Sequence, residues 1–232
     1  MDEVKRRQLE AEYERTDHWN YKSDPYEIRK YDRTLAVVPA GHYARVLEIG
    51  CSEGVFTRRL APLADEVLGL DVVPLALERA RAECGGLANV HFREFDINTD
   101  TLEGQFDLIF CAEVLYYLRW TRLRPVTRKV VSWLRRWGYL VAVHTANSIA
   151  EEWGFGPKGA ESTHRLFERP GIRRVGDHAY EGYVVSLFRK EADVRASAWR
   201  EQAEDLVGLD YVALARTVLR RVVARTSRRR GA

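Results

Sequence analysis

The chain has 232 residues, of which 46% are apolar and 31% charged, and this composition is typical of a folded globular protein rather than a disordered or fibrous one. No run of about 18 uncharged apolar residues occurs and the N-terminal residues are charged, so we expect neither a membrane span nor a signal peptide. Cys51, Cys84 and Cys111 lie far apart, which excludes a C-x-x-C zinc site and a disulfide framework and predicts a reducing, cytoplasmic location.

The charge is unevenly distributed along the chain. The formal net charge is +3, but residues 211–232 contain seven arginines and no acid, which leaves −4 for residues 1–210. A mildly acidic body argues against nucleic acid as a partner, because nucleic-acid-binding domains present basic surfaces. The basic character therefore belongs to the C-terminal tail.

The N-terminal region predicts two helices joined by an aromatic loop. Residues 2–18 are polar and compatible with a helix, and residues 19–26 are rich in aromatic side chains around Pro25. Apolar residues three or four apart predict a second helix over Glu27–Val38. The aromatic loop residues, which include Trp19, Tyr21 and Tyr26, either cover a ligand or fix this helix to the core.

A glycine turn follows the first predicted strand, Val46–Ile49, and precedes a helix over residues 55–63. Gly50 allows a tight turn because it has no Cβ atom, and Gly54 leaves room for a ligand or for close helix packing. The first N–H groups of the helix point at whatever lies over the strand end. The spacing departs from the dinucleotide fingerprint G-x-G-x-x-G, with Ser52 at the middle glycine. This pattern predicts the nucleotide-binding corner of an open α/β sheet.

Two carboxylates at strand ends narrow the choice of ligand. Glu48 would repel a pyrophosphate but suits an ammonium group, which the amino-acid half of S-adenosylmethionine (SAM) carries. Asp71 ends the strand Glu66–Asp71, 17 residues after Gly54, which is close to the spacing of the ribose-binding acid in Rossmann-type folds. An N-cap for the helix over Pro74–Glu83 is the alternative role of Asp71. We expect Glu48 and Asp71 to hold opposite ends of one nucleoside ligand.

The next two strands complete a recognisable pattern. Asn89–Phe95 predicts the third strand, and the run Phe106-Asp107-Leu108-Ile109 predicts the fourth. With the glycine turn and the two carboxylates in the same order, the chain resembles a class I SAM-dependent methyltransferase. The resemblance implies that Asp96 hydrogen-bonds the adenine amino group and that Ile97 packs on its ring, whereas an ordinary turn aspartate is the alternative.

The resemblance also implies ligand contacts for the residues that follow the fourth strand. Glu113, Tyr116 and Tyr117 are expected beside the sulfonium or at the mouth of the acceptor pocket, since strand ends of such sheets face the ligand crevice. The residues expected to contact the cofactor are Tyr21, Tyr26, Lys30, Glu48, Gly50, Cys51, Ser52, Gly54, Asp71, Val72, Asp96, Ile97, Ala112 and Glu113.

Three segments resemble a narrower family. Asp24-Pro25-Tyr26-Glu27-x-Arg29-Lys30, Arg45–Cys51 and Ala112–Leu118 are similar to the nodulation-type (NodS-like) methyltransferases, whose namesake N-methylates the amino sugar of a chitin-like oligosaccharide. This resemblance implies that the N-terminal segment packs over SAM, with Tyr26 and Lys30 near the cofactor. The sequence departs from the family pattern at Arg119-Trp120 and beyond His144, where acceptor-binding residues are expected.

A histidine ends the fifth predicted strand. After a helix over Trp120–Arg136, the strand Gly138–His144 ends at the ligand edge, and a histidine there suits the removal of a hydroxyl proton during methylation. His144 is therefore the first candidate base, the alternative being a histidine hydrogen-bonded to a loop or to the substrate. Glu113 and His164 complete the candidate catalytic set. No metal-ligand spacing is visible, so no metal is expected.

The residues after the fifth strand predict acceptor contacts. A glycine-rich loop over residues 153–160 would move as a lid, and its Trp153 and Phe155 would stack on a sugar face or an aromatic ring. The residues expected to bind substrate are Tyr116, Tyr117, Asn147, Trp153 and Phe155.

The last elements complete the predicted sheet. Ile172–Tyr180 and Tyr183–Lys190 predict a hairpin with Glu181–Gly182 as its turn. The expected fold is α/β: a Rossmann-like, seven-stranded, mostly parallel sheet with an antiparallel last strand and helices on both faces. Residues 1–40 would form a helical cover over the cofactor, 41–190 the SAM-binding core, and 191–232 a basic helical extension. That extension suits a membrane surface, an anionic partner or a second subunit in a homodimer, or it packs on its own domain.

The predicted function is methyl transfer from SAM, with S-adenosylhomocysteine (SAH) as product, to a small-molecule acceptor. The acceptor is expected to be a sugar hydroxyl or amine of a saccharide or glycosylated natural product. Two alternatives remain at this point: a methyltransferase acting on RNA or protein, and a non-catalytic module that binds SAM or NAD.

Overall fold

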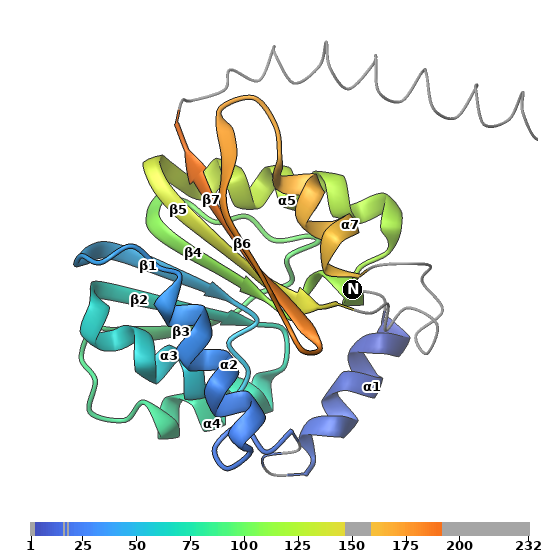
Figure 1. Ribbon diagram of the computed structural model, residues 1–232. Coiled ribbons are helices and arrows are strands. Elements are labelled where there is room, and N and C mark those ends of the chain that lie inside the picture. Colours follow the sequence, from blue (N-terminus) through green and yellow to red (C-terminus); the bar gives the residue numbers. More distant parts are fainter. Residues whose placement is uncertain (1–2, 16, 18, 147–158, 192–232) are drawn as a thin grey trace, which may run out of the picture. The chain divides into compact units, whose positions relative to one another are not determined.

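The computed structural model describes residues 3–15, 17, 19–146 and 159–191 (Figure 1). In this part of the chain, seven strands form one sheet in the order β3-β2-β1-β4-β5-β7-β6. The strands are β1 (Tyr43–Ile49), β2 (Ala64–Asp71), β3 (Val90–Glu94), β4 (Phe106–Ala112), β5 (Leu134–Thr145), β6 (Ile172–Tyr180) and β7 (Tyr183–Lys190). Strand β7 is antiparallel to both β5 and β6, and the other pairings are parallel, which confirms the predicted fold class.

Helices flank the sheet on both faces. The helices are α1 (Glu3–Tyr13), α2 (Pro25–Ala36), α3 (Val55–Leu60), α4 (Pro74–Glu83), α5 (Trp120–Trp133) and α7 (Ala160–His164), with 3-10 turns η1 (Ala61–Leu63), η2 (Leu115–Tyr117) and η3 (Arg165–Phe167). On one face, Phe56 of α3 packs in a cluster with Val46 and Val141, and Tyr31 of α2 packs against the same cluster. Because side chains alternate along a strand, the next residue of β5, Ala142, faces the other side, where α5 and α7 pack.

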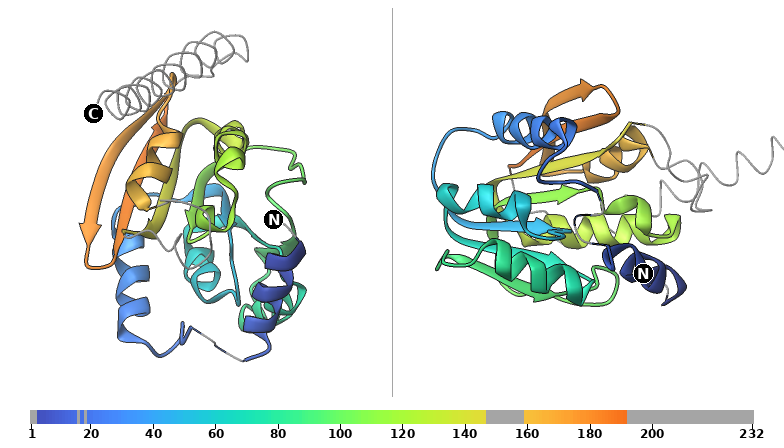
Figure 2. Two further views of the ribbon diagram at one scale, coloured as in Figure 1. Left: turned by 90° about the vertical axis from the view of Figure 1, so that its right-hand side faces the viewer. Right: turned by 90° about the horizontal axis from the view of Figure 1, so that it is seen from below.

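The parallel order brings the carboxyl ends of β1, β2, β4 and β5 to one edge. Figure 2 (left) looks onto this edge and shows α1 and α2 on opposite sides of it. The strand interiors are apolar on both faces, as expected for a parallel sheet covered on both sides. This edge is where ligands bind in open α/β sheets.

Several element boundaries differ from those predicted by one to four residues, and for two of them the structure gives the reason. Helix α2 begins at Pro25 rather than Glu27, because the Asp24 carboxylate caps it by accepting a hydrogen bond from the Tyr26 N–H at 2.7 Å. Helix α5 ends at Trp133 and β5 already begins at Leu134, whereas the sequence predicts helix to Arg136. The reason lies in pairing: Leu134 pairs with Phe106, and the register then shifts through an irregular segment in which Trp137 has φ +69°.

Other boundaries match the predictions. Helix α4 spans Pro74–Glu83 and the hairpin strands span Ile172–Tyr180 and Tyr183–Lys190. Gly182 turns the hairpin at φ +86°, a conformation that favours glycine. No described helix is long and apolar enough to cross a membrane. The predicted C-terminal extension lies outside the described residues.

Candidate active site

A cavity of about 370 Å³ lies at the carboxyl ends of β1, β2 and β4 and is lined by residues of α1, α2 and the loop between them. This volume is in the range of small-molecule sites. Many predicted contact residues line it: Tyr21, Lys30, Gly50, Ser52, Asp71, Val72, Asp96, Ile97, Ala112, Glu113, Tyr116 and Tyr117.

The glycine turn closes one wall of the cavity. Gly50 has φ +80°, and a Cβ atom there would lie 2.3 Å from Cγ2 of Val114, so only glycine fits without displacing that side chain. The Gly50 N–H donates to the Leu70 carbonyl at 2.8 Å. Ser52, also left-handed at φ +49°, donates its N–H to Asp71 at 2.9 Å. The turn thus joins the ends of β1 and β2.

Asp71 is held by backbone groups. Its carboxylate accepts from the N–H of Ser52 and, at 3.0 Å, from that of Val73, and 7% of the residue is exposed. Burial raises its pKa, and the N–H groups of Val73 and Ser52 oppose that rise. A carboxylate accepts up to about four hydrogen bonds, so oxygen lone pairs stay available for a ribose diol. The N-cap residue of α4 is Val73, so the alternative role of Asp71 as N-cap does not apply.

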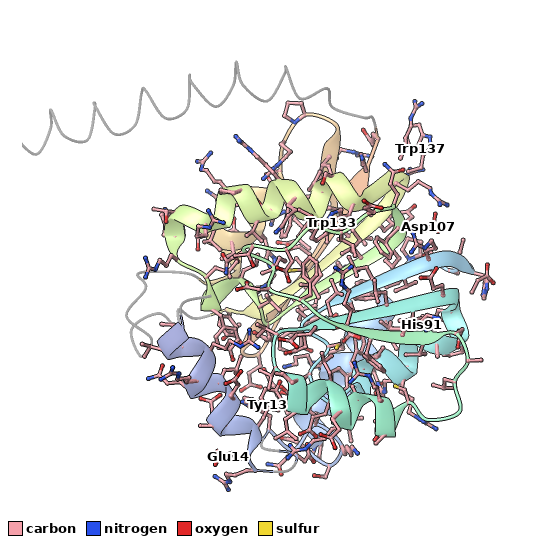
Figure 3. All side chains as sticks on the ribbon, turned by 180° about the vertical axis from the view of Figure 1, so that it is seen from behind. Tyr13, Glu14, His91, Asp107, Trp133 and Trp137 are labelled. Carbon is pink, nitrogen blue, oxygen red and sulfur yellow. The ribbon has the colours of Figure 1, made fainter. Side chains whose placement is uncertain are left out.

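The predicted adenine contacts lie at the end of β3. Asp96 and Ile97 line the cavity beside Phe95, whose ring packs edge-on against Trp133. Asp96 also accepts from the Asn98 N–H at 2.8 Å, so the alternative of a turn aspartate is present as well. Figure 3 shows Trp133 beneath α5, whereas Trp137 points away from the sheet.

Glu48 lies deeper than predicted. It is 3% exposed, and Thr57 Oγ1 donates to its carboxylate at 2.5 Å. Burial raises the pKa of Glu48 to about 8, although the Thr57 hydrogen bond opposes the rise. Glu48 and Cys51 line a smaller hollow of about 70 Å³, which shares Gly50 and Ser52 with the main cavity. Glu48 and Asp71 thus line adjoining hollows on either side of one turn.

Charged side chains gather at the opposite wall of the cavity. Lys30 Nζ is 2.9 Å from Glu27 Oε2 and 3.7 Å from Glu113 Oε1. The Thr145 N–H donates to Glu113 Oε2 at 3.3 Å, and the backbone of Glu113 is left-handed at φ +52°. Burial raises the pKa of Glu113, while Lys30 and the Thr145 N–H lower it, and Tyr116 hydrogen-bonds the same carboxylate. Glu113 is therefore a half-buried carboxylate that faces the cavity, and its raised pKa makes it a stronger proton acceptor than an exposed carboxylate.

His144 and His164 do not line the cavity. Both are 0% exposed, and the pKa of each is lowered by burial, that of His164 to about 4. His144 Nε2 accepts from the Leu115 N–H at 3.2 Å. Its neighbours Val143 and Thr145 line the two hollows, so His144, one residue out of phase, points to the other face of the sheet. The predicted role of general base does not fit, because a base must lie within reach of the proton it takes. The alternative of a histidine bound to a loop does fit.

Two predicted cofactor contacts have structural roles instead. Tyr26 is 37% exposed and packs edge-on against Tyr183, outside the cavity, so the alternative that it fixes α2 to the core fits. Gly54, at φ +79°, approaches α4 so closely that a Cβ would lie 2.9 Å from Cα of Ala80, which favours helix packing over ligand contact. The predicted substrate contacts Asn147, Trp153 and Phe155 lie outside the described residues.

The sequence predicts a helical cover over residues 1–40 but does not identify which α1 residues face the cavity. Leu9, Glu12 and Tyr13 line the cavity, and the Tyr13 hydroxyl donates to Ser52 Oγ at 2.7 Å. Figure 3 shows Tyr13 on α1, at the end of the sheet opposite Asp107. The spacing of Leu9 and Tyr13, one helical turn apart in an otherwise polar helix, is the signal that marks this face. Among the described residues, no group of three His, Cys, Asp or Glu side chains could hold a metal ion.

Comparisons with known proteins identify the family of the chain. The family model Nodulation protein S (NodS) matches residues 1–179. Nodulation protein S of Bradyrhizobium diazoefficiens is 35% identical over 161 residues, which cover 68% of this chain and 77% of that protein. Nodulation protein S of Sinorhizobium fredii is 31% identical over 191 residues, covering 79% of this chain and 86% of that protein.

A solved structure has the same fold. The crystal structure of N-methyltransferase NodS from Bradyrhizobium japonicum WM9 in complex with SAH superposes with a TM-score of 0.73 and is 28% identical, covering 80% of this chain and 98% of that one. The match of the family model over most of the chain, the relatives and the sheet order all lead to one conclusion. The chain belongs to the NodS family and is a class I SAM-dependent methyltransferase.

Proposed function

We propose that this SAM-dependent methyltransferase transfers the methyl group to an amine or hydroxyl of a small saccharide, and that Glu113 takes the acceptor's proton. The observation that carries the proposal is the cavity of about 370 Å³, with backbone-held Asp71 at one end and the Glu27–Lys30–Glu113 cluster at the other. The relatives named Nodulation protein S and the structure named N-methyltransferase NodS favour a saccharide amine over other acceptors.

The residues of the first end fit SAM. The Asp71 carboxylate lines the cavity, where it would accept from ribose hydroxyls, and Ile97 and Phe95 offer apolar surface for a base ring. Bound SAM supplies an electrophilic methyl group. Glu48, in the hollow on the other side of the glycine turn, would attract the ammonium group of SAM. That positive charge would in turn favour the ionised form of the Glu48 carboxylate.

The residues of the second end fit a polar acceptor. An acceptor amine attacks a methyl group only after losing its proton, and Glu113 faces the cavity with a raised pKa. Lys30 lowers the pKa of Glu113 and so keeps the carboxylate available as a base. Tyr116 and Tyr117, whose ring centroids are 4.6 Å apart, offer aromatic surface on which a sugar face can pack.

Catalysis otherwise rests on positioning. Leu9 and Tyr13 of α1 line the cavity, so they keep water from the reacting atoms, and Tyr13 is 4% exposed. An acceptor held in line with the methyl group gains the large rate advantage of an intramolecular reaction.

The test is incubation of the full chain with methyl-labelled SAM and an acceptor panel. Glucosamine oligosaccharides, their N-acetylated counterparts, phenols, RNA and a protein mixture are each read by mass gain. We expect methylation of the glucosamine oligosaccharides, and the N-acetylated counterparts show whether a free amine is needed. Labelling of RNA, protein or phenols without labelling of any saccharide would contradict the proposal and favour the alternative methyltransferases.

A further inference from the structure

A chain of hydrogen bonds links the back wall of the cavity to the outer strands of the sheet. His144 of β5 contacts His164 of α7, with Nδ1 and Nε2 3.0 Å apart. His164 Nδ1 is 2.7 Å from Ser186 Oγ of β7, and Ser186 hydrogen-bonds Asp177 of β6. At the inner end, His144 Nε2 contacts the Leu115 N–H. Each member comes from a different element, and both histidines and Ser186 are 0% exposed.

The backbone fixes the direction of every bond in this chain. The Leu115 N–H can only donate, so His144 Nε2 accepts and its proton lies on Nδ1. That Nδ1–H donates to His164 Nε2, which places the proton of His164 on Nδ1 as well. His164 Nδ1–H then donates to Ser186 Oγ, and the Ser186 hydroxyl donates to the Asp177 carboxylate. Donors and acceptors match at every step, and both rings are neutral.

The surroundings keep the rings neutral. His164 is faced by His144 of β5, by Arg174 and Asp177 of β6 and by Glu161 of α7. Burial and Arg174 lower its pKa, while Asp177 and Glu161 raise it. Arg174 Nη1 is also 3.2 Å from Asp177 Oδ1, which anchors the outer end of the chain.

We infer that this His144–His164–Ser186–Asp177 chain positions the cavity wall that carries the proton-accepting Glu113. The Leu115 N–H belongs to turn η2, which begins two residues after Glu113 and contains Tyr116. The Tyr116 ring lies edge-on to His144, with centroids 6.2 Å apart, and Tyr116 hydrogen-bonds Glu113. His144 and His164 are thus positioning residues that act through Leu115 and Tyr116. The inference rests on the proposed function in one respect, the role of Glu113 as base.

The first experiment needs no acceptor. In the full chain labelled with ¹⁵N-histidine, NMR correlates ring nitrogens with ring protons and assigns the tautomer of each histidine, with His144→Gln and His164→Gln used for assignment. We expect both rings to be neutral and protonated on Nδ1, whereas histidine in water favours Nε2–H. An Nε2–H tautomer, or a charged ring at neutral pH, at either position would overturn the inference.

The second experiment separates positioning from packing. In H164Q the amide oxygen accepts from His144 and the amide N–H donates to Ser186, so the direction of the chain is kept, whereas H164L breaks it. With a glucosamine oligosaccharide as acceptor, we expect kcat to fall about tenfold or more in H164L and about threefold or less in H164Q. The Kd for SAM, measured by calorimetry, should stay near that of the unchanged chain in both. Equal losses in both variants, or full kcat in H164L, would overturn the inference.

The experiments distinguish a failure of this inference from a failure of the proposed function. If H164L does not fold, the tautomers of the unchanged chain still decide. If Glu113 is not the base, E113Q keeps its kcat while both histidines remain protonated on Nδ1, and only the proposed role of Glu113 fails.

Discussion

The two ends of the cavity are built in different ways. At the Asp71 end, the carboxylate is fixed by the N–H of Ser52, in the turn that needs glycine at position 50, and by the N–H of Val73. At the Glu113 end, the carboxylate contacts Lys30 of α2 and the N–H of Thr145, both distant in sequence, as well as nearby Tyr116 of η2. One end is local in sequence and rigid, and the other is assembled by the tertiary fold.

This difference separates binding from chemistry. A group fixed by backbone geometry is well suited to a cofactor that is the same in every turnover. A group held by side chains can be adjusted for an acceptor, and its pKa depends on charged neighbours such as Lys30. Substitutions at the two ends should therefore change different kinetic constants.

The largest effect is expected at the Glu113 end. In E113Q the amide cannot take a proton, so kcat should fall about 10³-fold, within the range for removal of a general base. The Kd for SAM should change by about threefold or less, because a neutral amide of the same shape keeps the hydrogen bond from Thr145. Steady-state kinetics with a glucosamine oligosaccharide and calorimetry with SAM measure the two constants. An E113Q enzyme with full kcat and weakened SAM binding would reverse the assignment of the two ends.

Glu48, on the far side of the turn, should make stability depend on pH. The pKa of Glu48 in the folded chain is about 8, above the ordinary value of a carboxyl group. Between about pH 4.5 and pH 8, the folded chain therefore keeps a proton on Glu48 that the unfolded chain has already released. The unfolding free energy in the absence of SAM should therefore fall as pH rises through this window, by roughly 4 kcal/mol in total.

In E48Q this fall should be much smaller, leaving the part due to Asp71 and Glu113, whose pKa values burial also raises. Urea unfolding at pH 5, 6, 7 and 8 measures both chains. A pH dependence in E48Q equal to that of the unchanged chain would show that Glu48 is ionised in the free protein. The exposed pair His42–Asp65 offers a control, since D65N removes a carboxylate that is not buried.

A smaller effect is expected at the Asp71 end. D71A removes the acceptor for two ribose hydroxyls, and hydrogen bonds to a charged group are strong, so the Kd for SAM should rise about 50-fold, roughly 2 kcal/mol. At saturating SAM, kcat should change little. D65A, at the opposite end of the same strand, is the matched control. A D71A chain that binds SAM normally but turns over slowly would contradict the division between the two ends. Thermal unfolding checks that the loss of the Ser52 and Val73 hydrogen bonds leaves the chain folded.

Local sequence predicts the local end well. The glycine turn, the strand ending in Asp71 and helix α4 all follow from patterns within about 30 residues, because backbone conformation there is decided by glycine, proline and apolar runs. The hairpin at Gly182 was predictable for the same reason. The sheet order and the antiparallel β7 follow from the resemblance to class I methyltransferases.

The assembled end was harder to predict. The sequence predicts that His144 ends the fifth strand, but it does not predict which face of the sheet the side chain takes. That face depends on the register of β5 against β4 and β7, because a shift of one residue moves every side chain to the other face. The N-terminal cover was expected, but its cavity-lining residues were not named, because Leu9 and Tyr13 are a weak signal in an otherwise polar helix. Glu27 was missed because its role depends on Glu113, which only the fold brings to the Glu27–Lys30 pair of α2.

The smallest effect tests the boundary of the cavity. Tyr26 and Tyr21 were both predicted as cofactor contacts, but only Tyr21 lines the cavity, where it hydrogen-bonds Ser52. Y21F should therefore raise the Kd for SAM by about fivefold, near 1 kcal/mol for one lost hydrogen bond. Y26F, whose hydroxyl lies beside Gly182, should change it by less than about twofold, as expected for a surface substitution. Calorimetry with SAM compares the two variants, because each loses one tyrosine hydroxyl, Tyr21 inside the cavity and Tyr26 outside it. A larger loss in Y26F than in Y21F would mean that the N-terminal segment closes over SAM in an arrangement that brings Tyr26 inward.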